Sequence, residues 1–249
     1  MLKQISLLIL CAVAIVLFAT PVHACTSAVV SGKVTLDGRP LLWKNRDTDF
    51  MRNHVDYVKG ERYDFIAVVN SANAYLKEAW MGTNSAGFAL MNTQSYNLVD
   101  VKGDEERGAA NGRVIYRALE VCATVEDFCH FLDTISKPSD IEANFGVIDA
   151  QGGAAMFEVD YYKYVMYDAN NPKDAPYGYI ARTNFSFAGK VNEGAGYVRY
   201  MEADQVLMKA SATGNITPQF IFNDLSRSFR NRMLDIDLRS GGYNRPQAS

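Results

Sequence analysis

Short runs rich in β-branched and aromatic residues, each bounded by turn residues, recur along the chain after residue 25. Such runs are typical of β-strands. The first three predict strands over Thr26–Val30, Lys33–Leu36 and Pro40–Asn45, and the Asp37-Gly38 pair between the last two favours a tight hairpin. Seven more strands are predicted by the same pattern: Asp64–Asn70, Ala74–Trp80, Phe88–Asn92, Asn144–Asp149, Ala154–Val159, Tyr164–Tyr167 and Tyr179–Thr183.

Apolar residues instead recur with helical spacing in four segments. These segments are Gly112–Val121, Val125–Ile135, Gly196–Ala210 and Pro218–Arg227. Thr124 and Thr217 precede two of them as expected N-caps. Strands come first, a helix pair interrupts them, strands resume and helices return. This segregated order indicates the α+β class, with antiparallel sheets covered by helices rather than alternating βαβ units. No repeat or linker divides the pattern, so we expect a single domain.

The N-terminal segment has a different pattern, in which Lys3 precedes an unbroken apolar run over Leu7–Ala19. Thirteen residues are too few to span a bilayer of roughly 30 Å, but they suit the central region of a secretory signal peptide. Small residues at Val22 and Ala24 predict cleavage before Cys25. We therefore expect residues 1–24 to be removed and residues 25–249 to form the domain. The mature protein would be exported to the bacterial periplasm or beyond, with no stable membrane anchor.

The amino-acid composition and net charge exclude some classes of protein. A hydrophobic content of 48% excludes a disordered chain, and 25 Lys+Arg against 28 Asp+Glu leave a net charge of −3. No basic cluster stands out, so the sequence argues against nucleic acid as a partner. The sequence leaves the oligomeric state open, a homo-oligomer included.

Three cysteines remain after the predicted cleavage: Cys25, Cys122 and Cys129. Cys122 and Cys129 are compatible with either a disulfide or two free buried thiols, because sequence alone does not give the Cα separation. A dyad of Cys129 and His130 is disfavoured, since adjacent helical residues point in different directions. The few histidines and cysteines show no metal-ligand spacing, so we expect no metal and no cofactor.

A cysteine at the start of a mature chain carries a thiol and a free α-amine on one residue. The amine has a reference pKa of about 7.7–8.0, which lets it act as a general base near neutral pH. Cys25 is therefore a candidate nucleophile with its own base. The alternative is a lipoprotein, because Val22-His23-Ala24-Cys25 also resembles a lipobox. Lipidation would block both groups and leave a membrane-tethered binding module.

The segment that begins Cys25-Thr26-Ser27 and continues to Arg46-Asp47-Thr48-Asp49 resembles the start of cysteine N-terminal-nucleophile hydrolases. The likeness is to the choloylglycine hydrolases, penicillin V acylases and penicillin acyltransferases. In that group an N-terminal cysteine opens a strand, and an Arg-x-x-Asp motif follows. Arg46 and Asp49 fit the motif. A second register places Lys44 and Asp47 there, with lysine in place of arginine.

Three later stretches resemble the same group in the same order: Gly82–Asn92, Asn144–Asp149 and Ala181–Asn184. The resemblance implies that Asn92 and Asn184 supply the oxyanion hole. It also implies a catalytic arginine at the start of a late helix, for which Arg199 is the candidate. The implied fold is a four-layer αββα sandwich. Members of the group usually continue past the equivalent of residue 249, which leaves two alternatives, a domain shortened at its C-terminus or a fragment.

The resemblance implies an exported amidase that hydrolyses linear, non-peptide C–N bonds. Candidate substrates are small N-acyl amides: N-acyl amino acids, bile-salt-like conjugates and related N-acyl amines. Cys25 would form a thioester, Arg46 would hold its thiol, and Asp47 or Asp49 would orient its amine. An acyltransferase on the same scaffold differs only in the acceptor of the acyl group.

Overall fold

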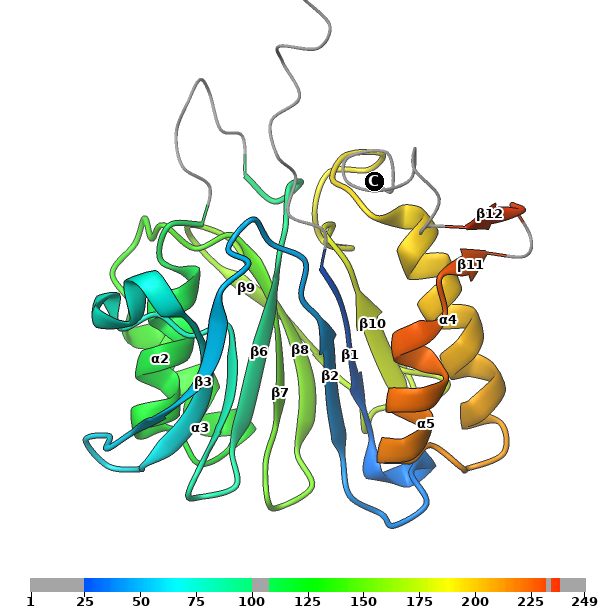
Figure 1. Ribbon diagram of the computed structural model, residues 1–249, viewed down its shortest axis with the longest axis horizontal. Helices are drawn as coiled ribbons and strands as arrows, with labels where there is room; N and C mark the ends of the chain where they lie inside the picture. The colour runs from blue at the N-terminus through cyan, green and yellow to red at the C-terminus, as the bar shows by residue number, and fades with distance from the viewer. Residues whose placement is uncertain (1–24, 100–107, 232–233, 238–249) are drawn as a thin grey trace, which may run out of the picture.

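The computed structural model describes residues 25–99, 108–231 and 234–237, so the predicted signal peptide and residues 238–249 lie outside it. Two antiparallel sheets pack face to face between two layers of helices (Figure 1). Helices α2 (Asn111–Val121) and α3 (Val125–Thr134) cover one side. Helices α4 (Tyr197–Ser211) and α5 (Pro218–Asn223) cover the other. The predicted α+β class and αββα layering are confirmed.

The smaller sheet has three strands in the order β10-β1-β2. Their bounds are β1 Thr26–Val30, β2 Leu41–Asn45 and β10 Tyr179–Arg182. Strand β1 lies in the centre, with Ser27 opposite Lys44 on one side and Arg182 on the other. The strand that begins directly after Cys25 is therefore fixed along both edges.

The larger sheet has seven strands that follow one another in chain order from β3 to β9. Their bounds are β3 Asn53–Val58, β4 Phe65–Asn70, β5 Met81–Asn84, β6 Ala89–Gln94, β7 Ala143–Ile148, β8 Ala154–Val159 and β9 Tyr164–Asp168. Every neighbouring pair is antiparallel. A separate two-stranded ribbon joins β11 (Arg230–Asn231) to β12 (Ile236–Asp237).

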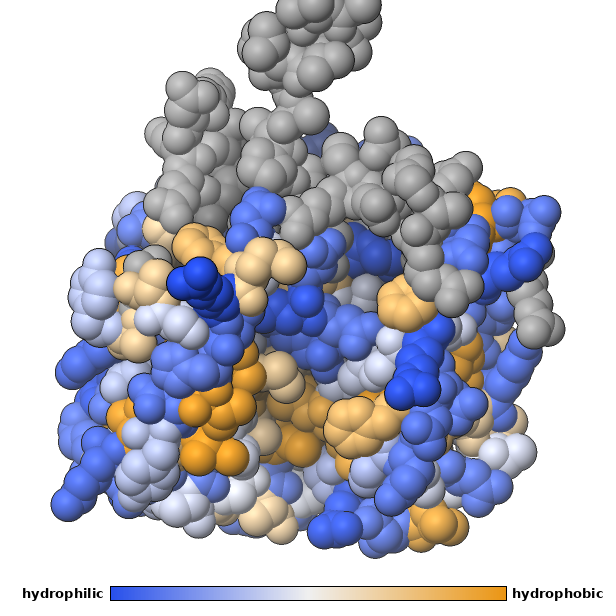
Figure 2. Space-filling view, viewed as in Figure 1, coloured by the Kyte–Doolittle hydropathy of each residue, from blue (hydrophilic) through white to orange (hydrophobic). Residues whose placement is uncertain are grey.

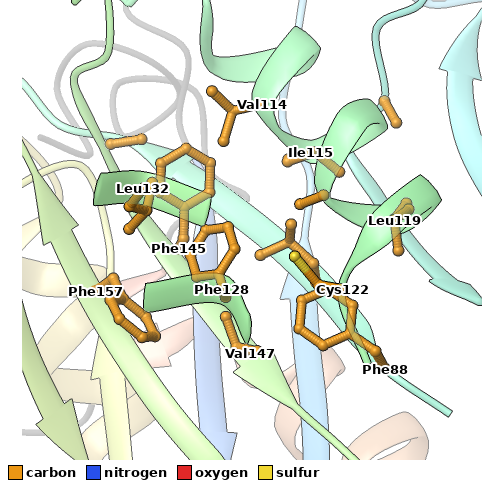
Figure 3. Close-up of a cluster of buried hydrophobic side chains, with 14 of the residues drawn as sticks. Phe88, Val114, Ile115, Leu119, Cys122, Phe128, Leu132, Phe145, Val147 and Phe157 are labelled. Carbon is orange, nitrogen blue, oxygen red and sulfur yellow. The ribbon is translucent and has the colours of Figure 1, made fainter. Parts of the chain in front are cut away.

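The largest hydrophobic core lies between the seven-stranded sheet and helices α2 and α3 (Figure 3). Phe128 of α3 is fully buried at its centre and contacts Phe145 and Phe157 edge-on, with ring centroids 5.9 and 5.1 Å apart. Thr124 caps α3 as expected, since its side chain accepts from the backbone of Asp127 while the Asp127 carboxylate accepts from the backbone of Thr124. This core anchors the sheet that faces the small one.

The layer between the two sheets is mostly apolar near its centre, where Val29 and Met91 meet. The small sheet does not cover the whole large sheet, and an apolar groove of about 370 Å³ remains beside β2, lined by residues that include Leu42, Val68 and Met81. Hydrophobic side chains gather there in the lower middle of the face shown in Figure 2. Lys44 lies two residues beyond Leu42 on the same face of β2, between the groove and Cys25.

Several expectations about local structure were wrong. The segment predicted as a strand over Lys33–Leu36 contains the 3₁₀ helix Gly32–Val34, because the Ser31 hydroxyl accepts from the backbone N–H of Lys33 and starts a turn. The strand predicted over Ala74–Trp80 is largely the 3₁₀ helix Ser71–Leu76, which ends at Lys77 with φ 54°.

The pattern also missed strands: β3 and β5 of the large sheet, and the short strands β11 and β12. Strand β3 pairs only with β4 and so forms an edge of its sheet. Its sequence NHVDYV is polar enough to hide the alternation. The helix predicted over Pro218–Arg227 is divided, with α5 followed by the 3₁₀ helix Leu225–Arg227. The remaining predicted elements are present, with boundaries shifted by a residue or two.

Cys122 and Cys129 are both free, so the disulfide alternative is wrong. Cys122 is buried and Cys129 is half-buried. Among the described residues, no helix is long and apolar enough to cross a membrane. The same residues contain no group of three or more His, Cys, Asp or Glu side chains arranged to hold a metal ion.

Candidate active site

Cys25 lies directly before β1, with only 7% of its surface exposed. Alternate residues of a strand face opposite sides of a sheet. Val29 packs in the layer between the sheets, whereas Ala28 and Val30 pack against the helices. Cys25 shares the face of Val29 and therefore points into the layer between the sheets. Its Sγ lies 3.7 Å from the backbone oxygen of Asp47, to which it donates.

Lys44 crosses the layer between the sheets close to Cys25. Its Nζ donates to the backbone oxygen of Trp80 and to Oδ1 of Asn92, both at 3.0 Å. Burial lowers the pKa of Lys44 to about 8, opposed by the Cys25 charge and reinforced by that of Arg46. A lysine ammonium has only donors, so the Asn92 amide must turn its oxygen to Lys44 and its NH₂ group elsewhere. Lys44 thus orients Asn92.

The two predicted registers of the Arg-x-x-Asp motif differ in which carboxylate approaches Cys25. Asp47 is half-buried, its backbone oxygen contacts the Cys25 thiol, and its charge acts on Arg199. Asp49 is exposed, two residues further along the loop. The geometry therefore fits the register of Lys44 and Asp47 better than that of Arg46 and Asp49.

Arg46 lies at the open end of the same strand face. Its Nη1 donates to Asn53 Oδ1, and its Nη2 donates to Asn70 Oδ1 at 2.8 Å. The guanidinium also stacks over the Trp80 ring, 5.0 Å from its centroid. Burial lowers its pKa, and the Cys25 charge opposes that shift. Arg46 is thus held rigidly near the thiol by neutral partners.

Arg199 reaches Cys25 from the first turn of α4. Its Nη1 donates to the backbone oxygen of Cys25 and to Thr26 Oγ1, the latter at 3.1 Å, and its Nη2 donates to Asn184 Oδ1 at 2.9 Å. A positive charge in the first turn is unfavourable beside the positive end of the helix dipole. The contacts of Arg199 with Cys25 and Asn184, rather than helix stability, therefore explain its position. Gly196 permits the approach, since a Cβ there would lie 2.5 Å from Arg199 Nη2 and its φ is 92°.

Asn184 follows β10 in a fully buried loop. Its Nδ2 donates to the backbone oxygen of Gln94 at 2.9 Å and retains a second hydrogen. The loop is held from below by Asn144, whose Nδ2 donates to the backbone oxygens of Thr183 and Phe185, each at 3.1 Å. Asn184 is therefore fixed between Arg199 and the large sheet.

The predicted residues Cys25, Asp47, Asn92, Asn184 and Arg199 thus lie in one connected cluster, and Arg46 borders it. Lys44 was not among the predicted site residues, although it lies within this cluster and donates to Asn92. The sequence does contain an indication of Lys44, because the second register of the Arg-x-x-Asp motif places this lysine at the arginine position.

Two antiparallel sheets packed between two helical layers, with Cys25 directly before the central strand of the small sheet, form the architecture of the N-terminal-nucleophile hydrolases. The family assignment is narrower. Residues 35–222 match the model of the family described as acyl-coenzyme A:6-aminopenicillanic acid acyl-transferase, and the chain belongs to this family.

The fold also resembles solved structures at low sequence identity. An N-acylethanolamine-hydrolyzing acid amidase ortholog from Caenorhabditis elegans is 15% identical with a TM-score of 0.53, covering 81% of this chain and 89% of the other. A conjugated bile acid hydrolase variant from Clostridium perfringens is 15% identical with a TM-score of 0.48, covering 81% and 74%. Penicillin V acylase from Agrobacterium tumefaciens is 18% identical with a TM-score of 0.36, covering 81% and 61%. No curated protein matches the sequence.

Proposed function

We propose that this protein is an exported cysteine amidase that hydrolyses linear amides of small N-acyl amines. The observation that carries the proposal is the environment of the buried Cys25 at the start of β1. Arg199 donates to the Cys25 backbone and to Asn184, and the charge of Lys44 interacts with Cys25. The predicted cleavage before Cys25 would free its α-amine. The enzyme would then act in the periplasm or outside the cell.

The proposed reaction starts with attack of the Cys25 thiol on the amide carbonyl. The α-amine of Cys25 accepts the thiol proton and returns it to the leaving amine, so the C–N bond breaks and a thioester remains. Water then attacks the thioester, the same amine takes its proton, and the carboxylic acid and free thiol are released. Asp47 would orient the amine through the loop that contacts the thiol.

The tetrahedral oxyanion would be stabilised by N–H groups of Asn92 and Asn184. Each amide is held through its oxygen by a cation, Lys44 for Asn92 and Arg199 for Asn184. Donors that are oriented before the reaction stabilise the developing charge without reorganisation, and removal of one typically costs about 100- to 1000-fold in rate.

Acyl transfer is the second candidate function, and the description of the family favours it. It shares every step up to the thioester, after which an amine replaces water. Adding hydroxylamine or a 6-aminopenicillanic acid acceptor to the assay separates the two reactions by their products.

Replacement of Cys25 tests the proposed function. In Cys25→Ala we expect loss of turnover on a panel of N-acyl amides, because no other thiol lies in the cluster. Cys122→Ala is the matched control, since burial raises the pKa of the Cys122 thiol to about 12 and keeps it unreactive. Turnover that survives in Cys25→Ala, or a diacylglycerol mass on Cys25, would refute the amidase proposal.

A further inference from the structure

Among the residues that the structure describes, the positive charges around Cys25 outnumber the negative ones. The charge of Cys25 acts on three cations, Lys44, Arg46 and Arg199. The Asp47 carboxylate acts on Arg199, one of the three. Within the described residues, none of the three cations forms a salt bridge, and all their hydrogen bonds go to amide, carbonyl or hydroxyl oxygens.

Buried or partly buried cations without an anionic partner are unfavourable. This protein can build a paired site, since Arg182 and Glu158 meet at 2.6 Å with both side chains almost fully buried. The excess positive charge beside Cys25 is therefore a specific feature of that site. It suits a ligand that brings its own negative charge.

Arg46 is the cation best placed to meet such a ligand. Lys44 and Arg199 are committed to the oxyanion asparagines and the Cys25 backbone. Arg46 is half-buried at the open end of the strand, and the described residues bind only two of its five N–H donors. A fixed, planar guanidinium with free donors is suited to bidentate binding of a carboxylate.

The distance between Arg46 and the nucleophile Cys25 also suits a ligand that contacts both residues. Thr26 and Asn45 are the terminal pair of the ladder between β1 and β2, so Cys25 and Arg46 lie directly beyond its end, one residue further along each chain segment. Opposite residues of such a ladder lie about 4.5–5.5 Å apart at their Cα atoms. In an N-acyl amino acid, the carboxylate is attached to the carbon that bears the scissile nitrogen, so it lies within side-chain reach of Arg46 when the amide meets Cys25.

We propose that Arg46 binds the carboxylate of the amine half of the substrate, and that the preferred substrates are N-acyl amino acids rather than neutral N-acyl amines. The inference rests on the proposed amidase function and assigns Arg46 a role in specificity. The carboxylate supplies the charge that the cluster lacks, and it places the carbonyl carbon at the thiol.

A matched substrate pair tests the proposal: an N-acylglycine and the N-acylethanolamine with the same acyl chain, which differ by a carboxylate and a hydroxymethyl group. We expect wild type to prefer the acylglycine. In Arg46→Gln the ratio of the two kcat/KM values should fall about 10- to 100-fold, mainly through KM, as expected for loss of hydrogen bonds to a charged group. Arg46→Lys should restore part of the ratio, and the exposed Arg39→Gln should leave it unchanged.

An unchanged ratio in Arg46→Gln would overturn the proposal, because equal losses mean that Arg46 acts on the nucleophile instead. A wild type that prefers the neutral amide would overturn it as well. Failure of the amidase function gives a different result, no turnover of either amide. In that case calorimetric titration of the Cys25→Ala protein with the acylglycine decides: binding weakened by Arg46→Gln supports the carboxylate site, and unchanged or absent binding refutes it.

Discussion

Two arginines contact the region around Asn184: Arg182, which is buried, and Arg199, which is half-buried. Arg182 has an anionic partner, and Arg199 does not have one among the described residues. Arg182 donates to Glu158, whose two oxygens also accept from the backbone N–H groups of Phe187 and Ala188 at 2.8 and 2.7 Å. Arg182 further stacks on Phe187, 3.8 Å from the ring centroid. Arg199, on the other side of the loop, has only neutral partners among the described residues.

The presence or absence of an anionic partner distinguishes an arginine that stabilises the fold from one that is available for chemistry. The Arg182–Glu158 cluster pairs its two charges, and Glu158 also accepts from two backbone N–H groups of the loop, so the cluster fixes the backbone that holds Asn184. Among the described residues, the cluster around Cys25 keeps excess positive charge and free Arg46 donors, which in the proposed function would stabilise a thiolate, an oxyanion or a substrate carboxylate. We therefore expect changes in the first cluster to affect folding and changes in the second to affect chemistry.

The largest effect should follow from breaking the buried pair. Glu158→Gln leaves Arg182 without a counterion, and the free energy of unfolding should fall by about 3–5 kcal/mol. Glu61→Gln is the control, because its ion pair with Arg117 is exposed to solvent and should contribute little to stability. Urea unfolding measures both. A Glu158→Gln loss no larger than that of Glu61→Gln would show that the pair is not structural.

A smaller effect, on rate rather than stability, is expected from the titration of Lys44. Its pKa of about 8 means that the ammonium is present below pH 8 and lost above it. If the charge orients Asn92, kcat/KM should decline above pH 8, by about tenfold at pH 9. Lys44→Arg keeps a charge at all these pH values and should move the decline upward. Identical alkaline limbs in the two proteins would exclude Lys44 as the titrating group.

Much of the fold could be predicted from the sequence because most strands are apolar, β-branched and bounded by turn residues. The exceptions have local causes. Strand β3 is a polar edge strand, and its identity depends on pairing with β4 rather than on its own pattern. The segment before β5 turns at Lys77 in the left-handed region, which no propensity of lysine predicts.

The candidate site was only partly predictable for a similar reason. Cys25 and the asparagines lie in recognisable motifs, so their positions could be read from the chain. The choice between Asp47 and Asp49 depends on how the loop after β2 folds back onto the thiol, which is a tertiary effect. The contact of Arg199 with Cys25 spans 174 positions in sequence and depends on the positive φ of Gly196.

The central claim is that Cys25 becomes the N-terminal nucleophile and carries the acyl group. Acid quenching of the active, exported protein during turnover of an N-acylglycine, followed by mass spectrometry of its peptides, tests this claim directly. We predict a peptide that begins at Cys25 and bears one acyl group on its sulfur, with the α-amine unmodified. A catalytically active chain in which Cys25 is still preceded by other residues, or an acyl group found elsewhere, would contradict the account.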